Sequence, residues 1–263
     1  MSEEHQRPSI TIPLPSKATA TLVLVPLLIV SAFVIGVLWT KVQYLEGRGG
    51  TAVAGTGAAG SAPTAPNPNQ GPPTEPQAGP VEPLKAEDHV RGDRKARILL
   101  FEYSDLECPF CKRFHPTAQQ IVDAYKGQVA WVYRHFPLDQ IHSKADKEAE
   151  AVECAKDQGG EDAFWKMTDK IFEVTPSNNG LNLDDLPKLA GEIGLDANTL
   201  KSCLDSGKYT AHVEGDYQGG VKAGVTGTPG NILLDTKTGK TKLMPGAFPF
   251  DQFKTAIDEM LKS

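Results

Sequence analysis

The sequence predicts an α/β sheet interrupted by a helical insertion. Apolar runs of strand length flank a helical segment near residue 110, which predicts a βαβ unit, and two more short strands precede a final amphipathic helix. Between these halves the hydrophobic pattern is helical from about residue 140 to 224. The expected elements are strand 96–103, helix 109–126, strand 129–136, helical stretches 143–157, 161–174, 183–193 and 197–224, strands 232–234 and 241–244, and helix 250–261.

Each of these elements has its own local signal. The first strand, 96–103, is an apolar run bounded by charged residues, which is typical of a buried strand. The first helix begins at Pro109, because proline is favoured in the first turn of a helix. The last helix places its large apolar side chains on one face, at Phe250, Phe253, Ile257 and Leu261. Folding 85–263 as one domain gives enough chain for a hydrophobic core.

An apolar segment near the N-terminus predicts a membrane anchor. Residues 18–40 contain 23 positions without a charge, and a helix of that length spans roughly 34 Å, enough for a bilayer core. A cleaved signal peptide is the alternative, but the apolar run is longer than a usual signal-peptide core. We therefore expect residues 1–17 to be a cytoplasmic tail and 18–40 to be a single transmembrane anchor.

A linker is expected between the anchor and the folded domain, over residues 41–84. Eight prolines and seven glycines lie between residues 49 and 83, with Glu75 and Glu82 as the only charges there. Such a composition has little to bury, so it predicts a disordered tether. The whole chain has Lys+Arg 27 against Asp+Glu 33 and a formal net charge of −6, which argues against a nucleic-acid-binding surface.

The motif Cys108-Pro109-Phe110-Cys111 predicts a redox-active pair. It lies between a predicted strand and a predicted helix of the βαβ unit, where a C-x-x-C sequence is typical of thiol–disulfide chemistry. A thiolate at a helix N-terminus is stabilised by unpaired N–H groups and the helix dipole. We expect Cys108 to be the exposed nucleophile and Cys111 the resolving cysteine. A zinc site and a purely structural bridge are the alternatives, both less favoured by the spacing of the four cysteines.

Three separated motifs together resemble DsbA-type thiol-disulfide oxidoreductases of the thioredoxin-like superfamily, in their membrane-anchored or secreted bacterial branch. They are Phe101-Glu102-Tyr103-Ser104, the Cys108–Cys111 motif, and Gly227-Thr228-Pro229 after the helical block. The resemblance covers roughly residues 89–261. It implies a thioredoxin-like fold with an inserted helical domain, and no small-molecule cofactor or metal.

The resemblance also implies roles for particular residues. Thr228 and Pro229 match the family's cis-proline loop, so we expect them, with Pro109 and Phe110, to bind the substrate. Glu102 matches a buried carboxylate that exchanges a proton with Cys111, and an exposed strand glutamate is the alternative. Cys154 and Cys203 match a second, structural disulfide found in some members; two free thiols or a second redox pair are the alternatives.

Two departures from the family pattern concern the cysteines and the loop. Phe110 stands where the best-known oxidants carry histidine, and Glu107 adds a negative charge beside Cys108, so we expect a higher thiol pKa and a less oxidising pair. Gly230 and Asn231 follow Pro229, where apolar or hydroxyl residues are more usual. The downstream residues Lys112, Arg113 and His115 are expected on a solvated helix face, and His135 is expected to pack or cap the end of a strand.

The function expected from these features is a membrane-tethered thiol-disulfide oxidoreductase that introduces disulfide bonds into extracytoplasmic proteins. Its substrates would be reduced, unfolded proteins, and a quinone-linked membrane thiol oxidase, DsbB-like or VKOR-like, would re-oxidise it. Cysteine pairs of this kind belong in an oxidising compartment, which places the catalytic domain outside the cytoplasmic membrane. A reductase or isomerase using the same site, and a redox-inert peptide-binding or chaperone-like module, are the alternatives.

Overall fold

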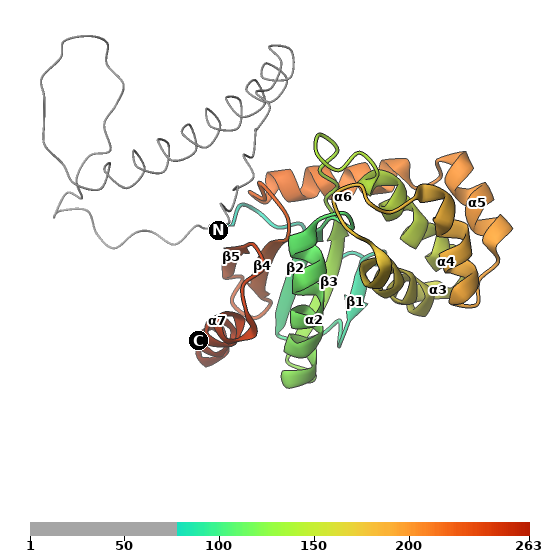
Figure 1. Cartoon of the computed structure of the whole chain (residues 1–263). Helices are drawn as coiled ribbons and strands as arrows, with labels where there is room; N and C mark the ends of the chain where they lie inside the picture. Colours follow the sequence, from blue (N-terminus) through green and yellow to red (C-terminus); the bar gives the residue numbers. More distant parts are fainter. Residues whose placement is uncertain (1–77) are drawn as a thin grey trace, which may run out of the picture. The chain divides into compact units, whose positions relative to one another are not determined.

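The computed structural model of the protein describes residues 78–263 (Figure 1). The predicted tail 1–17, the predicted anchor 18–40 and residues 41–77 of the predicted linker lie outside the described residues. Within residues 78–263, none of the helices is both long enough and apolar enough to span a membrane.

The fold is built on a five-stranded sheet with the strand order β1-β3-β2-β4-β5. The central strand β2 runs parallel to β3 and antiparallel to β4, and α2 crosses over between β2 and β3. This confirms the predicted βαβ unit. The strands are β1 (His89–Arg91), β2 (Ile98–Ser104), β3 (Val129–His135), β4 (Gly230–Asp235) and β5 (Thr241–Pro245), and the crossover helix is α2 (Pro109–Ala124).

Helices and the incoming chain bury both faces of the sheet. Side chains from Ile98 and Leu100 of β2 enter the core beneath α2, α3 and α7 (Phe250–Lys262), whereas Leu99 and Phe101 enter a second cluster on the opposite face. This alternation follows from the two-residue period of a strand. Because both faces are covered, β2 is a nearly continuous apolar run, and this is why its sequence predicts a buried strand so clearly.

The helical insertion between β3 and β4 matches the predicted block. It contains α3 (Ala145–Val174), the 3-10 turn η1 (Leu183–Asp185), α4 (Leu186–Glu192), α5 (Ala197–Ser206) and α6 (Thr210–Lys222). The long α3 changes direction at Gly160, where φ is 69° and ψ −160°. Only glycine adopts this conformation without strain, which explains the break expected between the two predicted helical stretches. In Figure 1, α3, α4 and α5 lie on the β1 side of the sheet, whereas α6 passes over β2 and β3.

Two expectations about the beginning of the domain are wrong. The three-residue strand β1 was not expected, because His89 and Arg91 are polar and the run is too short to show a period. Residues 78–84, expected within the disordered linker, pack against the folded domain. The N–H of Gly79 donates to the carbonyl oxygen of Ala223 at 2.9 Å, and Val81 and Leu84 contact the second apolar cluster.

Arg134 of β3 explains why this segment is ordered. Its side chain is only 2% exposed and pairs with the Asp88 carboxylate through Nε and Nη2, both at 2.9 Å. It also donates to the carbonyl oxygens of Glu82 and Pro83 at 3.2 and 3.1 Å, and to the hydroxyl of Tyr103 at 3.1 Å. One buried guanidinium therefore holds the incoming chain against the sheet.

A disulfide between Cys154 of α3 and Cys203 of α5 holds the insertion together. This is the pairing that the family resemblance implies. The two cysteines are 49 residues apart in the sequence and their Cα atoms are 5.9 Å apart. The bridge therefore joins helices that are separated by η1 and α4.

Replacing both Cys154 and Cys203 by alanine is expected to lower the free energy of unfolding by about 3–4 kcal/mol, because opening a loop of this length restores entropy to the unfolded chain. Urea titration followed by circular dichroism measures the change. Ser202→Ala, at an exposed neighbouring position of α5, is the control and should change the value by less than about 0.5 kcal/mol. Identical urea midpoints for the double variant and the parent would contradict the expectation.

Candidate active site

The cysteine motif lies where strand β2 gives way to helix α2. Cys108 is the N-cap of α2, Pro109 is its first residue, and Cys111 lies one turn into the helix. The N–H of Cys108 donates to the carbonyl oxygen of Asp105 at 3.1 Å, which closes the turn between strand and helix. Both cysteines are free thiols in the structure. The predicted context of a C-x-x-C redox pair is therefore confirmed.

Cys108 is less accessible than expected. Its side chain is 3% exposed and Cys111 is fully buried, so the expectation of an exposed nucleophile is wrong. The adjacent Phe110 is 50% exposed, and the guanidinium of Arg113 lies 5.0 Å from the centre of its ring. The surface beside the thiol is therefore an exposed aromatic ring flanked by a cation.

The peptide bond between Thr228 and Pro229 is cis, as the resemblance implies, and this loop faces Cys108. The Cys108 Sγ lies 3.5 Å from the carbonyl oxygen of Thr228. The contacts of Gly230 and Asn231 explain why these residues, which are unusual for the family, follow Pro229. A Cβ on Gly230 would lie 2.4 Å from a methyl group of Val225, and the buried Asn231 donates through Nδ2 to the carbonyl oxygen of Gly246 at 3.0 Å.

The two thiols differ strongly in acidity. The pKa of Cys108 is lowered to about 6, first by a hydrogen bond from Cys111 and also by the N–H groups of Cys111 and Phe110 at the start of α2. Burial, together with the neighbouring Cys108, raises the pKa of Cys111 well above its usual value. The expectation from Phe110 and Glu107 was a higher pKa than in the family's best-known oxidants, and a value of about 6 agrees with it, since the nucleophilic cysteine of DsbA has a pKa of about 3.5.

Glu107 is not among the groups that shift the Cys108 pKa most, and its carboxylate has other partners. It accepts from the N–H of Gly180 at 3.2 Å, and it lies beside Glu148, whose pKa is raised to about 10 by burial and by Glu107. His115 also departs from expectation: it is buried and its Nε2 lies 2.6 Å from Asp169 Oδ1. Lys112 extends to the carbonyl oxygen of Thr175, at 2.6 Å.

In the reduced protein, alkylation of Cys108 by iodoacetamide is expected to reach half its maximal rate near pH 6, since only the thiolate reacts. Peptide mass spectrometry should find Cys108 modified at pH 7 and Cys111 unmodified. Cys111→Ala removes the side-chain donor and is expected to move the half-maximal pH upward. A half-maximal rate near pH 9 in the parent protein would contradict the low pKa.

Glu102 is fully buried in the middle of the sheet. Its Oε1 accepts a hydrogen bond from the hydroxyl of Ser104 at 2.8 Å. Burial raises the pKa of Glu102 to about 8, so the carboxyl group is largely protonated at neutral pH. Its charge in turn raises the pKa of Cys111. The buried carboxylate implied by the resemblance is therefore present near the second cysteine, and an exposed strand glutamate is excluded.

Glu102→Gln is expected to remove a pH dependence of stability. Between pH 4.5 and about 8 the unfolded carboxyl is ionised while folded Glu102 keeps its proton, so the parent protein loses stability as pH rises, by about 1.4 kcal/mol per unit. Glutamine has no proton to lose, so the difference between variant and parent should grow across that window. Urea titrations at pH 5, 6, 7 and 8 measure it, and parallel curves would contradict the raised pKa.

Asp105 and His142 belong to the site, but they were not expected. Asp105 follows β2 directly and its Oδ2 accepts from the N–H of Leu138 at 2.9 Å and from Nδ1 of His142 at 2.8 Å. Its own N–H lies 3.5 Å from the Cys111 Sγ. Burial opposes the charged form of His142, but Asp105 raises its pKa. The sequence signal is a carboxylate at the end of a buried strand, three residues before the first cysteine.

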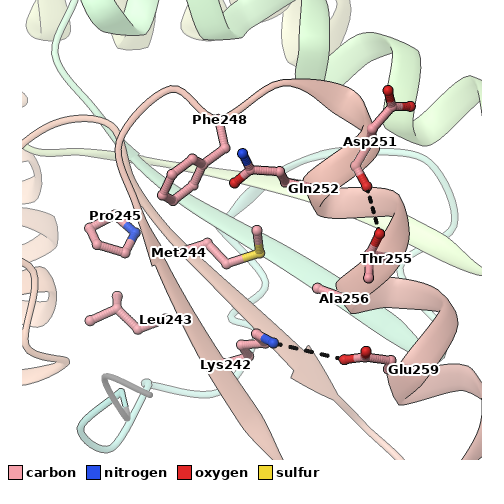
Figure 2. A pocket seen from close by; sticks show the side chains of 10 residues that line it. All are labelled: Lys242, Leu243, Met244, Pro245, Phe248, Asp251, Gln252, Thr255, Ala256 and Glu259. Atoms are coloured by element: carbon pink, nitrogen blue, oxygen red, sulfur yellow. Dashed lines mark hydrogen bonds and ion pairs between the residues drawn. The ribbon is translucent and has the colours of Figure 1, made fainter. Parts of the chain in front are cut away.

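One hollow in the described part of the chain lies away from the cysteines. It has a volume of about 630 Å³ and lies between β5 and α7, lined by Leu243, Met244, Pro245, Phe248 and Ala256 among others (Figure 2). The ion pair between Lys242 and Glu259 lies at its end, with 3.9 Å between the charged atoms. None of the cysteine-motif or cis-proline residues lines it.

The fold and the site together define a thiol-disulfide oxidoreductase of thioredoxin-like architecture. The thioredoxin family model matches residues 85–259. The crystal structure of Pseudomonas aeruginosa DsbA2 is 35% identical, covers 69% of this chain and 98% of its own, and superimposes with a TM-score of 0.60. BdbD from Bacillus subtilis is 25% identical, with a TM-score of 0.61 over 72% of this chain and all of its own. The chain belongs to the DsbA-type thiol-disulfide oxidoreductases of the thioredoxin family.

Some curated relatives carry a similar segment within much longer chains. The Na(+)/H(+) antiporter NhaA 3 of Salinispora tropica is 34% identical over 150 residues, which are 57% of this chain and 22% of the antiporter. NhaA 1 of Salinispora arenicola matches in the same proportion. The chain thus spans about a fifth of the length of these relatives, and the match concerns that segment alone.

Proposed function

We propose that this domain introduces disulfide bonds into proteins outside the cytoplasm by exchange through Cys108 and Cys111. The observation that carries the proposal is the low pKa of Cys108 beside the high pKa of Cys111. Stabilising the Cys108 thiolate stabilises the reduced pair, which makes the disulfide a stronger oxidant. A pKa of about 6 lies between those of thioredoxin, about 7, and DsbA, about 3.5.

In the forward reaction a substrate thiolate attacks Cys108 Sγ of the Cys108–Cys111 disulfide, and Cys111 leaves as a thiolate. Protonated Glu102 is the nearby group able to supply its proton, since burial holds that proton at neutral pH. A second substrate thiolate then attacks the mixed disulfide at the substrate sulfur. The substrate leaves with a new disulfide, and both cysteines of the domain are reduced.

The surface around Cys108 suits an extended, partly apolar substrate. Phe110 and Ile141 are 50% and 64% exposed, and a hollow of about 410 Å³ lies between residues 137–141, Tyr217 and Thr226. Thr226 belongs to the loop that leads to Thr228 and Pro229. An unfolded chain offers apolar side chains that can pack against Phe110, Ile141 and the hollow. Its backbone N–H groups can donate hydrogen bonds to the carbonyl oxygen of Thr228.

The proposal includes a tether and an oxidising partner. The apolar segment 18–40 would anchor the chain, with residues 1–17 in the cytoplasm and the catalytic domain outside. The Cys154–Cys203 disulfide supports that placement, because such bridges persist in oxidising compartments. A membrane quinone-linked thiol oxidase, DsbB-like or VKOR-like, would re-oxidise Cys108 and Cys111. Protease treatment of intact and lysed cells tests the orientation.

The test of the direction of exchange is the reduction potential of the Cys108–Cys111 pair in the full chain, equilibrated with glutathione buffers. We expect a value of about −180 mV or higher, in the range of protein disulfide isomerase and DsbA. A value near about −270 mV, as in thioredoxin, would overturn the proposal and make the domain an electron donor. Cys108→Ser with full activity would instead support a redox-inert peptide-binding module.

A further inference from the structure

Three histidine rings converge on a single carboxylate oxygen at the junction of the sheet and the helical insertion. The oxygen is Oε1 of Glu153, on α3. The Nε2 atoms of His89, His135 and His212 lie 2.7, 3.1 and 3.2 Å from it. These residues come from β1, the end of β3 and α6, and none of them belongs to the exchange site.

The strand pairing explains how two of the histidines meet. β1 and β3 are antiparallel, with His89 opposite Tyr133, and His135 is two residues beyond Tyr133. Residues two apart on a strand share a face, so both rings point to the side covered by α3. The His89 ring stacks on Phe164 of α3, with ring centres 3.4 Å apart and an angle of 3° between the planes. The arrangement is therefore rigid and buried.

Hydrogen bonding alone does not account well for this convergence. A carboxylate oxygen has two lone pairs, and the Nε2 atoms of three rings face one oxygen. A third donor at this distance has no lone pair directed at it. If the ring nitrogens are unprotonated, His89, His135 and Glu153 instead present two imidazole lone pairs and a carboxylate close to one another, which is the donor set of a metal ion.

The spacing of the donor atoms suits a small tetrahedral ion. Zinc–nitrogen bonds of about 2.0–2.1 Å place neighbouring ligand atoms of a tetrahedron about 3.3 Å apart. The distances from Glu153 Oε1 to the Nε2 atoms of His89 and His135 lie within about 0.6 Å of that value. One ligand atom from each of His89, His135 and Glu153 lies within 4.8 Å of the others. Imidazole nitrogens favour zinc and related ions, whereas calcium and magnesium favour oxygen.

An outer carboxylate orients His89 as metal-binding histidines require. The Nδ1 of His89 lies 3.1 Å from Glu161 Oε2. Glu161 Oε1 is itself held by the N–H of Val90 and by Nε1 of Trp165, both at 2.9 Å. Histidines that bind a metal through one nitrogen usually donate from the other to a carboxylate, which fixes the tautomer. His212, with 28% of its side chain exposed, provides the route by which an ion enters.

We propose that His89, His135 and Glu153 bind a divalent transition-metal ion of the zinc type, with His212 beside the position that they leave open. The ion would join the sheet, through β1 and β3, to the insertion, through α3. Its effect is then on the stability of the junction rather than on the exchange chemistry. Binding displaces any protons on the two Nε2 atoms, so affinity falls as pH decreases.

The test uses the full chain in detergent, without a polyhistidine tag and with Cys108 and Cys111 oxidised so that their thiols cannot bind the metal. After chelator treatment, the protein is dialysed against Zn²⁺, and its metal content and thermal unfolding are measured. We expect one zinc ion per chain, a melting temperature that rises with Zn²⁺, and no comparable rise with Ca²⁺. Co²⁺ should give the visible absorption of a tetrahedral site without a thiolate band.

Two variants at accessible positions assign the binding to this cluster. His212→Lys places a fixed positive charge beside Glu153 and the bound ion, and we expect at least about 10-fold weaker zinc binding. Glu161→Gln, at a side chain that is 41% exposed, removes the outer carboxylate and should weaken binding roughly 10–100-fold. Lys208→Gln, which removes a nearby exposed cation that pairs with Asp157, is the control and should bind zinc like the parent.

Three results would overturn the inference. The first is a zinc content below about a tenth of an ion per chain together with an unchanged melting temperature. The second is equally tight zinc binding by His212→Lys and the parent, which places the ion elsewhere. The third is stabilisation by Ca²⁺ in preference to Zn²⁺, which contradicts the argument from imidazole donors.

Discussion

Replacing Cys108 by serine is expected to abolish thiol–disulfide exchange, with a loss in rate of more than about 1,000-fold. Cys108 is the sulfur at the start of α2 whose thiolate is stabilised, and it is the one that lies beside the cis-proline loop. A hydroxyl at that position is too weakly acidic to replace the thiolate. The measurement is oxidation of a fluorescent dithiol peptide by the full chain, with glutathione disulfide as the oxidant.

Cys111→Ser separates the two cysteine roles. This variant also loses turnover, but it keeps the attacking sulfur, so it is expected to accumulate a mixed disulfide at Cys108 that mass spectrometry detects. Cys108→Ser should give no such adduct, because Cys111 is fully buried and its pKa is raised. An adduct on Cys111 in the Cys108→Ser variant would reverse the assignment of nucleophile and resolving cysteine.

Arg134→Met is expected to produce the largest loss of stability, about 5 kcal/mol of unfolding free energy. The change leaves the Asp88 carboxylate buried without its cation, and it removes the donors to Glu82, Pro83 and Tyr103. Breaking a buried pair by removing one partner costs more than removing both. Urea denaturation followed by tryptophan fluorescence and circular dichroism measures the loss.

A control variant and a double variant help to interpret the result for Arg134→Met. Lys201→Ala breaks an exposed pair with Asp205 on α5 and should change stability by less than about 1 kcal/mol. The double variant Asp88→Leu with Arg134→Met removes both buried charges and should recover part of the loss, and it provides a measurement if Arg134→Met does not fold. A loss below about 1 kcal/mol for Arg134→Met would mean that the pair contributes little.

The sequence predicted the fold wherever one local signal was enough. Strand β2 is apolar throughout because both of its faces are buried, and Gly160 marks the change of direction in α3. The cysteine motif was recognisable because its chemistry, its spacing and its place before a helix agree. The cis form of the Thr228–Pro229 bond and the Cys154–Cys203 bridge followed from the family resemblance, since neither can be derived from local sequence.

What the sequence did not predict depends on contacts between distant segments. β1 is three residues long, and its place at the sheet edge depends on pairing with β3. Glu107 is next to Cys108 in sequence, yet its carboxylate faces Gly180 and Glu148, which adjacency in the sequence did not show.

The histidine cluster could not be foreseen for the same reason. His89 and His135 are brought together only by antiparallel pairing of β1 with β3, and His212 is contributed by α6. His135 was expected to pack or cap the strand end, and the structure shows it buried there beside Glu153. Single histidines in a sequence carry no sign of a shared partner.

The bridge between Cys154 and Cys203 also determines what a protease can do to this domain. The turn that follows α3 contains three consecutive residues with positive φ, Ser177, Asn178 and Asn179, and both Pro176 and Asn178 are exposed. A cut there falls inside the loop that the disulfide closes. The two fragments therefore stay covalently joined, and a nicked chain separates into pieces only after the bond is reduced. In an oxidising compartment, such damage leaves the molecule in one piece.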